Sequence, residues 1–384
     1  MNFEFATATR ILFGPGTLRE AGPVTKAFGN RALVVTGRTA QRAEPLRAVL
    51  GVAGVECATF SVPGEPTTAS VREGAQRARD ERSEVIIGFG GGSALDAAKA
   101  IAALLANGGD VLDYLEVVGR GKPITTLSAP CITIPTTAGS GAEVTRNAVI
   151  GSPEHGVKAS LRSPLMLPRA AIVDPTLTHA LARRETANSG LDALSQLIEP
   201  FVSVKANPMV DAFCRAGMRL VARSLRRACE DGGDAAAREE MSLASLFGGL
   251  SLANAGLGAV HGFAGPLGGQ FPAPHGAVCA RLLPRVMEVN LRALCERCPG
   301  SETLRRYEEV AQLLTGDPRA TAAEGVAWVS QLCDALAVEP LRAFGVEPAH
   351  VAALVGKAAA ASSMKGNPIA LHAVELREIL ERSL

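Results

Sequence analysis

The chain has few aromatic residues and almost no net charge, and these two properties limit what its core and its partners can be. Phe, Trp and Tyr make up only 4% of its 384 residues, so the core must be built from Ala, Val, Leu and Ile. The formal net charge of +1 gives no electrostatic reason to expect a nucleic acid or a membrane surface as partner. With 47% hydrophobic and 20% charged residues, the composition is typical of a soluble globular protein.

Targeting signals are missing as well. The first residues, MNFEFATATRILFG, contain no basic segment followed by an apolar core. No apolar run reaches the roughly 18 residues that span a bilayer. We therefore expect a cytoplasmic protein with reduced cysteines. Only Cys295 and Cys298 form a C-x-x-C, a weak metal or redox signal; the others are scattered at Cys57, Cys131, Cys214, Cys229, Cys279 and Cys333.

The two halves of the chain differ in their predicted secondary structure, and the length of 384 residues favours two domains. The first half alternates short apolar strands with helical stretches, as in a parallel sheet with helices on both faces. From about Thr176 onward, long Ala- and Leu-rich segments have helical periodicity. Because Pro175 interrupts both element types, we predict an α/β domain over residues 1–177 and an all-helical domain over residues 178–384. The expected elements are strands at 32–37 and 57–62, a helix capped by Thr67 or Thr68, a strand, turn and helix within 84–106, a strand within 129–141, and helices at 183–203, 207–230 and 235–256.

A glycine-rich turn, GFGGGS from Gly88 to Ser93, follows a strand and precedes a helix. Open parallel sheets bind ligands outside the carboxyl ends of their strands, where glycines let the backbone approach a phosphate. The free N–H groups and dipole of the following helix favour the same ligand. The spacing is not G-x-G-x-x-G. The turn nevertheless predicts a dinucleotide pyrophosphate site, with a tight turn that binds nothing as the alternative.

A second loop of small residues, IPTTAGSGAEVT from Ile134 to Thr145, also leaves a strand. Thr136, Thr137 and Ser140 can form hydrogen bonds with a ribose or a phosphate. An ordinary polar loop is the alternative, but two such loops on one sheet favour a common ligand.

The stretch HGFAGPLGGQFPAPHG holds two of the six histidines, His261 and His275. Asp192 and Gln196 are four residues apart in a predicted helix, so their side chains share one face. One carboxylate and two imidazoles form the three-ligand set typical of a catalytic divalent ion, and Gln196 could add a neutral oxygen. Fe²⁺, Zn²⁺, Mn²⁺ and Ni²⁺ all accept such a set. The alternative is a satisfied helical acid with two unrelated loop histidines.

These motifs, taken in order, resemble the iron-containing (group III) alcohol dehydrogenases, which share their fold with glycerol dehydrogenases and dehydroquinate synthases. GFGGGSALDAAKAIA resembles the family's G-G-G-S-x-x-D-x-A-K turn, and IPTTAGSGAEVT is similar to its T-T-A-G-[ST]-G-[SA]-E-V-T loop. LRSPLMLPRAAIVDPTL resembles the segment that closes the first domain. GLDALSQLIEPFVS and HGFAGPLGGQFPAPHG are similar to its two metal signatures, so the match covers nearly the whole chain.

The resemblance implies a dinucleotide-binding α/β domain, an all-helical C-terminal domain and an active site in the cleft between them. It implies hydride transfer between NADP or NAD and a small alcohol or carbonyl substrate, with a divalent metal acting as Lewis acid. A homodimer or higher homo-oligomer is expected. The implied metal ligands are Asp192, Gln196, His261 and His275, of which Asp192, His261 and His275 are also catalytic. The predicted cofactor contacts are Gly37, Arg38, Gly90, Gly91, Gly92, Ser93, Asp96, Thr136, Thr137, Ser140, Thr145 and Lys158.

The chain departs from the family's metal signatures at two positions. Gln196 stands where the family helix D-A-L-T-H has its second ligand, and an amide is a weaker donor than an imidazole. Gly265 stands where H-G-x-x-H-P has its second histidine. We therefore expect weaker metal binding, no imidazole relay at this position, and space for a bulkier substrate.

A third departure concerns the cofactor. NAD-preferring members carry Asp after the first strand, where it binds the adenosine ribose and repels a 2′-phosphate. Here Gly37 takes that place, with Arg38 and Arg42 close by in sequence. Guanidinium groups favour a phosphate, so we predict that NADPH is preferred.

Two alternatives stay open. A maleylacetate-reductase-like enzyme would reduce an activated double bond, and Lys158 and Arg162 could contribute to the basic pocket that its anionic substrate needs. A metal-free cofactor-binding protein that has lost catalysis is the alternative of another class, because Gln196 and Gly265 weaken the metal signatures.

Overall fold

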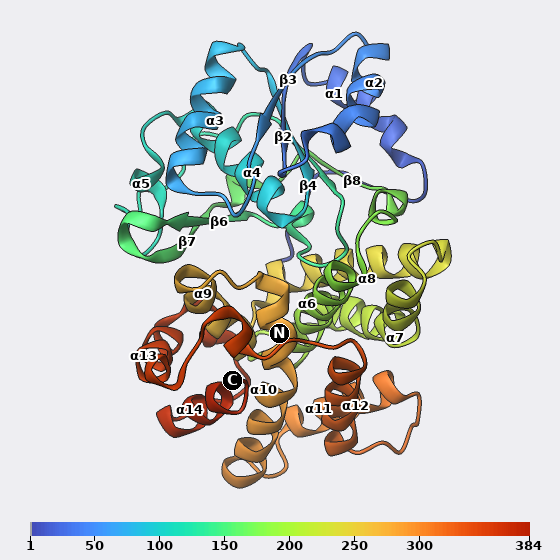
Figure 1. Ribbon diagram of the computed structural model, residues 1–384, viewed down its shortest axis with the longest axis vertical. Helices are drawn as coiled ribbons and strands as arrows, with labels where there is room; N and C mark the ends of the chain where they lie inside the picture. Colours follow the sequence, from blue (N-terminus) through green and yellow to red (C-terminus); the bar gives the residue numbers. More distant parts are fainter. Residues whose placement is uncertain (1) are drawn as a thin grey trace. The chain divides into compact units, whose positions relative to one another are not determined.

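The computed structural model describes residues 2–384, which form two compact units. The α/β unit comprises Ala6–Thr137 and Gly141–His179, and the helical unit comprises residues 2–5, Ala138–Ser140 and Ala180–Leu384. The units therefore divide after His179, whereas the sequence placed the division after residue 177. Figure 1 shows the α/β unit in blue to green and the part of the helical unit that follows residue 179 in green to red.

The α/β unit is built on a six-stranded parallel sheet, which confirms the predicted fold class. Its strands follow the spatial order β1-β8-β5-β4-β2-β3, and every neighbouring pair is parallel. The strands are β1 (Ile11–Phe13), β2 (Arg31–Thr36), β3 (Glu56–Ser61), β4 (Val85–Gly90), β5 (Cys131–Pro135) and β8 (Ala170–Val173).

Helices cover both faces of this sheet because successive side chains of a strand point to opposite faces. In β2, Ala32 and Val34 join the apolar cluster that contains α1 (Ala21–Lys26) and α2 (Glu44–Val52). Leu33 and Val35 join the cluster on the other face. That second face is covered by α3 (Thr68–Asp80) and α4 (Gly92–Asn107). The predicted N-cap at Thr67 is confirmed, since its hydroxyl accepts a hydrogen bond from the Ser70 N–H.

An antiparallel hairpin in this unit was not predicted. It consists of β6 (Asn147–Ser152) and β7 (Val157–Arg162), which follow the second glycine-rich loop. Only alternate residues of β6 are buried. The pattern was missed because no α-helix separates these strands; they join through a turn that ends at Gly156, in the left-handed conformation. A single helical turn, α5 (Val111–Tyr114), also belongs to this unit.

The sheet changes its winding direction between β2 and β4. The chain leaves β2 to form β3 on one side and returns to form β4 on the other side. Open α/β sheets bind ligands at such a switch point, outside the carboxyl ends of the strands. Gly37 follows β2 here, and its N atom lies 3.5 Å from the Cβ position of Gly90. The next loop adjoins them, because the Thr136 N–H donates to the Gly90 carbonyl over 2.9 Å.

A fully buried lysine fixes the second loop to α4. The Lys99 ammonium forms hydrogen bonds with the Ala142 carbonyl at 2.9 Å, the Thr145 hydroxyl at 2.8 Å and the Asn147 carbonyl at 2.5 Å. It also pairs with the Asp96 carboxylate at 2.9 Å. A buried charge is tolerated only when it is paired and hydrogen-bonded, and these four acceptors fulfil that condition.

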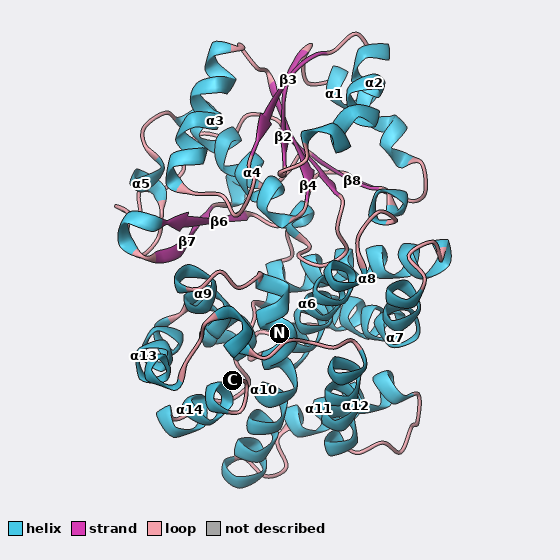
Figure 2. Cartoon of the chain, viewed as in Figure 1, coloured by secondary structure: helices cyan, strands magenta, loops and turns pink. Residues whose placement is uncertain are grey.

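The helical unit packs around one large apolar cluster, and Figure 2 shows no strand in its described residues. Its helices are α6 (Arg183–Val202), α7 (Pro208–Glu230), α8 (Ala235–Ala255), α9 (Ala259–Gln270), α10 (His275–Arg297), α11 (Glu302–Thr315), α12 (Ala322–Ala335), α13 (Val351–Ala360) and α14 (Ala373–Glu381). Among residues 2–384, no helix alone is long and apolar enough to cross a membrane. Helices α8 and α9 pass that test only as a pair bent by 98°.

The buried lysine gives a first testable prediction. Lys99→Met removes the donor from a carboxylate and two carbonyls, so we expect the unfolding free energy of the α/β unit to fall by about 3–5 kcal/mol. Calorimetric unfolding measures this change. Lys122→Met is the matched control, because Lys122 is 53% exposed where it pairs with Asp113, and a surface pair contributes less than about 1 kcal/mol. Equal effects of the two substitutions would contradict the role given to Lys99.

Candidate functional site

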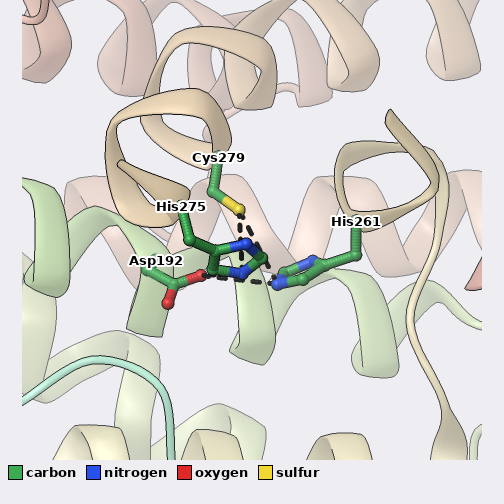
Figure 3. A group of neighbouring side chains, drawn as sticks. All are labelled: Asp192, His261, His275 and Cys279. Atoms are coloured by element: carbon green, nitrogen blue, oxygen red, sulfur yellow. Dashed lines mark hydrogen bonds and ion pairs between the residues drawn. The ribbon is translucent and has the colours of Figure 1, made fainter. Parts of the chain in front are cut away.

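Four side chains of the helical unit converge on one point. They are Asp192 from α6, His261 from α9, and His275 and Cys279 from α10. One ligand atom of each lies within 4.8 Å of those of the other three. Figure 3 shows the carboxylate, both imidazoles and the sulfur facing one another. The structure thus brings together three of the predicted ligands and adds a cysteine that was not predicted.

The distances within this cluster suit ligands of a single ion. Asp192 Oδ1 lies 3.4 Å from His261 Nε2 and 3.8 Å from His275 Nε2. Cys279 Sγ lies 3.8 Å from His261 Nε2 and 3.6 Å from His275 Nε2. A carboxylate, two imidazoles and a thiol are all ligands of divalent transition metals.

The first turn of α10 supplies two of the four side chains. His275 begins the helix and Cys279 follows one turn later, so both project from the same face. Gly276 lets this turn approach α6, because a Cβ there would lie 2.6 Å from the Asn188 carbonyl oxygen. The absence of a side chain at Gly276 therefore brings the start of α10 close to Asp192.

A buried carboxylate orients His261. His261 Nδ1 lies 2.6 Å from Glu199 Oε2, and the second oxygen of Glu199 accepts the Val260 N–H over 2.7 Å. Glu199 therefore caps the start of α9 and directs Nε2 of His261 toward the cluster. Histidine ligands commonly donate their other ring N–H to a carboxylate in this way, which fixes the ring and raises its basicity.

Burial differs among the four ligands. The side chains of Asp192 and His261 are 4% and 6% exposed, whereas that of His275 is 42% exposed. Asp192 Oδ1 is buried and has no hydrogen-bond partner among the described residues. A buried carboxylate oxygen without a hydrogen bond is unfavourable, and its position beside two imidazoles fits a bound cation.

The electrostatics of the cluster also favour positive charge. The pKa of His275 is raised to about 9, by Cys279 first and against the opposing effect of burial. Burial alone would lower the pKa of His261, but Cys279, Asp192 and Glu199 together raise it well above its usual value. Burial alone would raise the pKa of Asp192, but His275 and His261 outweigh it and the pKa is lowered.

Gln196 also lies in the interior of α6, one turn after Asp192. Its Oε1 is buried and lacks a hydrogen-bond partner among the described residues. This oxygen lies 3.4 Å from the position that a Cβ of Gly248, on α8, would occupy. Its role as a metal ligand stays a prediction.

Several predicted cofactor residues lie at the switch point of the sheet. Gly90 ends β4, and Gly92 and Ser93 begin α4, whose N-cap Gly91 offers no side-chain cap. A Cβ on Gly91 would lie 3.4 Å from the Thr137 side chain. The two glycine-rich loops are therefore neighbours, and the common ligand expected for them stays a prediction.

Other predicted cofactor residues have partners within the protein. Asp96 accepts the Val149 N–H in addition to pairing with Lys99, and Thr145 is buried against Lys99. Arg38 is exposed and donates to the Pro63 carbonyl. Lys158 pairs with Glu65. Ser140 belongs to the helical unit.

The sequence contained signals for both residues that the prediction missed. Glu199 follows Asp192 by seven residues, which is two helical turns on the same face. Cys279 follows His275 by four residues, the spacing of side-chain neighbours in a helix.

Gly265 follows His261 by four residues, and a Cβ there would have no neighbour within 4 Å.

A nicotinamide-dependent, metal-assisted oxidoreductase is the class that this fold and site define, and comparison with known proteins agrees. The sequence matches the family model of iron-containing alcohol dehydrogenase over residues 8–175. It matches the C-terminal model of the Fe-containing alcohol dehydrogenase family over residues 186–384. The chain belongs to the iron-containing alcohol dehydrogenase family, and the predicted family and enzyme class, an oxidoreductase of alcohol and carbonyl groups, are confirmed.

Individual relatives cover most of the chain. A choline dehydrogenase of Bacillus subtilis is 33% identical over 95% of this chain and 90% of its own length. A long-chain-alcohol dehydrogenase of Geobacillus thermodenitrificans is 40% identical over 73% of each chain. The crystal structure of a 1,3-propanediol oxidoreductase superposes with a TM-score of 0.93 at 30% identity and covers 100% of both chains.

The contact between Glu199 and His261 gives a second prediction. In Glu199→Gln an amide NH₂ must face one of two N–H donors, so His261 loses its fixed orientation. We expect metal affinity to fall about 10–100-fold, measured by competition with a chelator. Glu185→Gln, at the exposed start of α6, is the control. Unchanged affinity in Glu199→Gln would show that His261 does not depend on this carboxylate.

Proposed function

We propose that this protein is an NADPH-preferring, metal-assisted reductase of aldehydes or ketones that also oxidises the corresponding alcohols. The convergence of Asp192, His261 and His275 on one buried point is the observation that carries the proposal. A divalent ion held there supplies Lewis acidity at the substrate oxygen, and the nicotinamide supplies or takes the hydride.

Asp192 and His261 hold the ion in this proposal, and His275 leaves it accessible to the substrate. Asp192 supplies charge from the helix interior, and His261 is held rigidly by Glu199. His275 is the exposed ligand, so solvent or a substrate can approach from its side. Orienting groups of this kind keep the ion in place while the substrate exchanges.

The carboxyl edge of the parallel sheet supports the cofactor half of the proposal. Gly90 to Ser93 can receive the pyrophosphate at the start of α4. Thr136 and Thr137 lie beside this turn and can bond the phosphate or ribose. Asp96 and Thr145 act instead through Lys99, by holding the second loop in position.

Gly265 bears on the substrate. The position that its side chain would fill is open, one turn after His261 on α9. We propose that this space admits substrates bulkier than ethanol and that water replaces the missing imidazole in proton transfer.

The two alternatives receive less support. Lys158, a candidate for binding an anionic substrate such as maleylacetate, is already neutralised by Glu65. A metal-free binding protein would have no need of two imidazoles and a thiol gathered around a buried carboxylate. A cytoplasmic location and a homo-oligomeric state stay predictions.

Removal and return of the metal test the proposed function. The protein as purified, or loaded with Zn²⁺ or Fe²⁺, should reduce a panel of aldehydes and ketones with NADPH. A chelator should abolish turnover, and added metal should restore it. NADPH binding, followed by nicotinamide fluorescence, should persist without the metal. Cofactor binding without turnover of any carbonyl substrate would refute the proposal, and turnover of maleylacetate alone would favour the first alternative.

Cofactor preference gives a further prediction at Gly37. Its Cβ position is free of neighbours within 4 Å, so a side chain fits. Gly37→Asp should repel the 2′-phosphate, lower kcat/KM for NADPH by roughly tenfold or more, and leave kcat/KM for NADH equal or higher. The neutral Gly37→Asn is the control for added size. A wild-type protein that already uses NADH as efficiently as NADPH would contradict the predicted preference.

A further inference from the structure

The group of metal-ligating side chains contains a residue that the family signatures do not lead one to expect. The chain has Gln196 in place of the second helical histidine, and Cys279 lies within the cluster instead. We propose that Cys279, and not Gln196, is the fourth protein ligand, and that its thiolate makes this a zinc-selective site. The inference rests on the proposed function, because it assigns a ligand to the same ion.

The separations between ligand atoms match one tetrahedral ion. Zn–N distances of about 2.0–2.1 Å and a Zn–S distance of about 2.3 Å place neighbouring ligand atoms about 3.3–3.6 Å apart. The observed separations are 3.4 Å and 3.8 Å from Asp192 to the two imidazoles, and 3.8 Å and 3.6 Å from Cys279. The sulfur therefore lies about as far from the two imidazoles as Asp192 Oδ1 does, and all four ligand atoms lie within 4.8 Å of one another.

The position of Cys279 favours ligation over simple packing. Cys279 is completely buried and belongs to the apolar cluster of the helical unit, yet its sulfur faces both imidazoles. Cys214 shows the contrast: it is equally buried, but its sulfur contacts Ser251 Oγ at 3.3 Å. Of the eight cysteines, Cys279 alone belongs to a group of metal-ligating side chains within residues 2–384.

Gln196 offers the weaker donor for the same role. Its amide oxygen lies beside Gly248 of α8, and its carbonyl is a neutral, weak donor. The unpartnered oxygen remains available to a water molecule or a substrate hydroxyl near the ion. This assignment also explains why replacing a histidine by Gln196 does not dismantle the site.

The ligand type determines which metal is selected. Thiolate ligands are soft and favour Zn²⁺ over Fe²⁺ and Mn²⁺, and Zn²⁺ accepts a tetrahedral set of nitrogen, oxygen and sulfur ligands. The exposed side of His275 leaves room for a substrate oxygen as a fifth ligand. A member of an iron-containing family would in this case use zinc.

Cobalt substitution tests the assignment directly. Co²⁺ is titrated into metal-free wild-type protein and into Cys279→Ser, Gln196→Ala and Cys214→Ser, and the near-ultraviolet spectrum is recorded. Wild type, Gln196→Ala and Cys214→Ser should each show an intense thiolate-to-cobalt charge-transfer band. Cys279→Ser should lack this band, and its affinity for Zn²⁺ should fall at least about tenfold.

The outcomes separate this inference from the proposed function. Stoichiometric Co²⁺ binding without the band, or a band that survives in Cys279→Ser, would overturn the role of Cys279 and leave metal-dependent carbonyl reduction intact. Wild-type protein that binds neither Co²⁺ nor Zn²⁺ would overturn both. Near-ultraviolet and far-ultraviolet circular dichroism of each metal-free variant checks that the fold is unchanged.

A double variant tests the choice of metal. Gln196→His combined with Cys279→Ser rebuilds a set of three histidines and one aspartate, and the neighbouring Gly248 has no side chain to obstruct the imidazole. Offered equal Zn²⁺ and Fe²⁺ under anaerobic conditions, wild type should retain mainly zinc. The double variant should retain a larger share of iron, without the charge-transfer band. An identical metal ratio in both proteins would contradict selection by Cys279.

Discussion

The candidate metal site is organised around a buried negative charge. Asp192 lies inside α6, and its Oδ1 has no hydrogen-bond donor among the described residues. Burial of an unpaired carboxylate is among the most unfavourable features that a fold can contain. The two imidazoles and the sulfur gathered around it form, with Asp192, a cage for a cation. The surrounding contacts explain how three separate helices deliver those side chains to one point.

Two contacts, one through Glu199 and one at Gly276, position the helices that carry these side chains. Glu199, on α6, accepts the Val260 N–H with one oxygen and contacts His261 Nδ1 with the other. It therefore ties α6 to the start of α9 and orients His261. Gly276 permits the backbone of α10 to approach α6. In the α/β unit, Lys99 has a comparable role, since it holds the second loop beside the glycine turn. In both units, buried polar side chains position the loops and helix ends that carry the chemistry.

The fold class and part of the elements could be predicted from the sequence. Alternating Val- and Ile-rich strands gave β2 to β5, and helical periodicity gave α6 to α8. The β6–β7 hairpin escaped prediction because no α-helix separates its strands and only alternate residues are buried. The predicted cleft between the two domains stays a prediction.

The site was predictable in part. Asp192, His261 and His275 were found from residue type and spacing, and the structure brings them together. Cys279 was overlooked because cysteines were considered for their spacing to other cysteines and not to a histidine one helical turn away. Spacing alone also could not show that Gln196 Oε1 lies beside Gly248, or that Asp96 and Thr145 bond to Lys99. Such facts depend on how helices pack against one another.

X-ray absorption at the zinc edge of the metal-loaded protein tests the central claim most directly. An ion held by Asp192, His261, His275 and Cys279 predicts one sulfur neighbour at about 2.3 Å and nitrogen or oxygen neighbours at about 2.0–2.2 Å. A spectrum with imidazole scattering and no sulfur would contradict ligation by Cys279. A spectrum with neither sulfur nor imidazole would place the metal elsewhere and contradict the whole site.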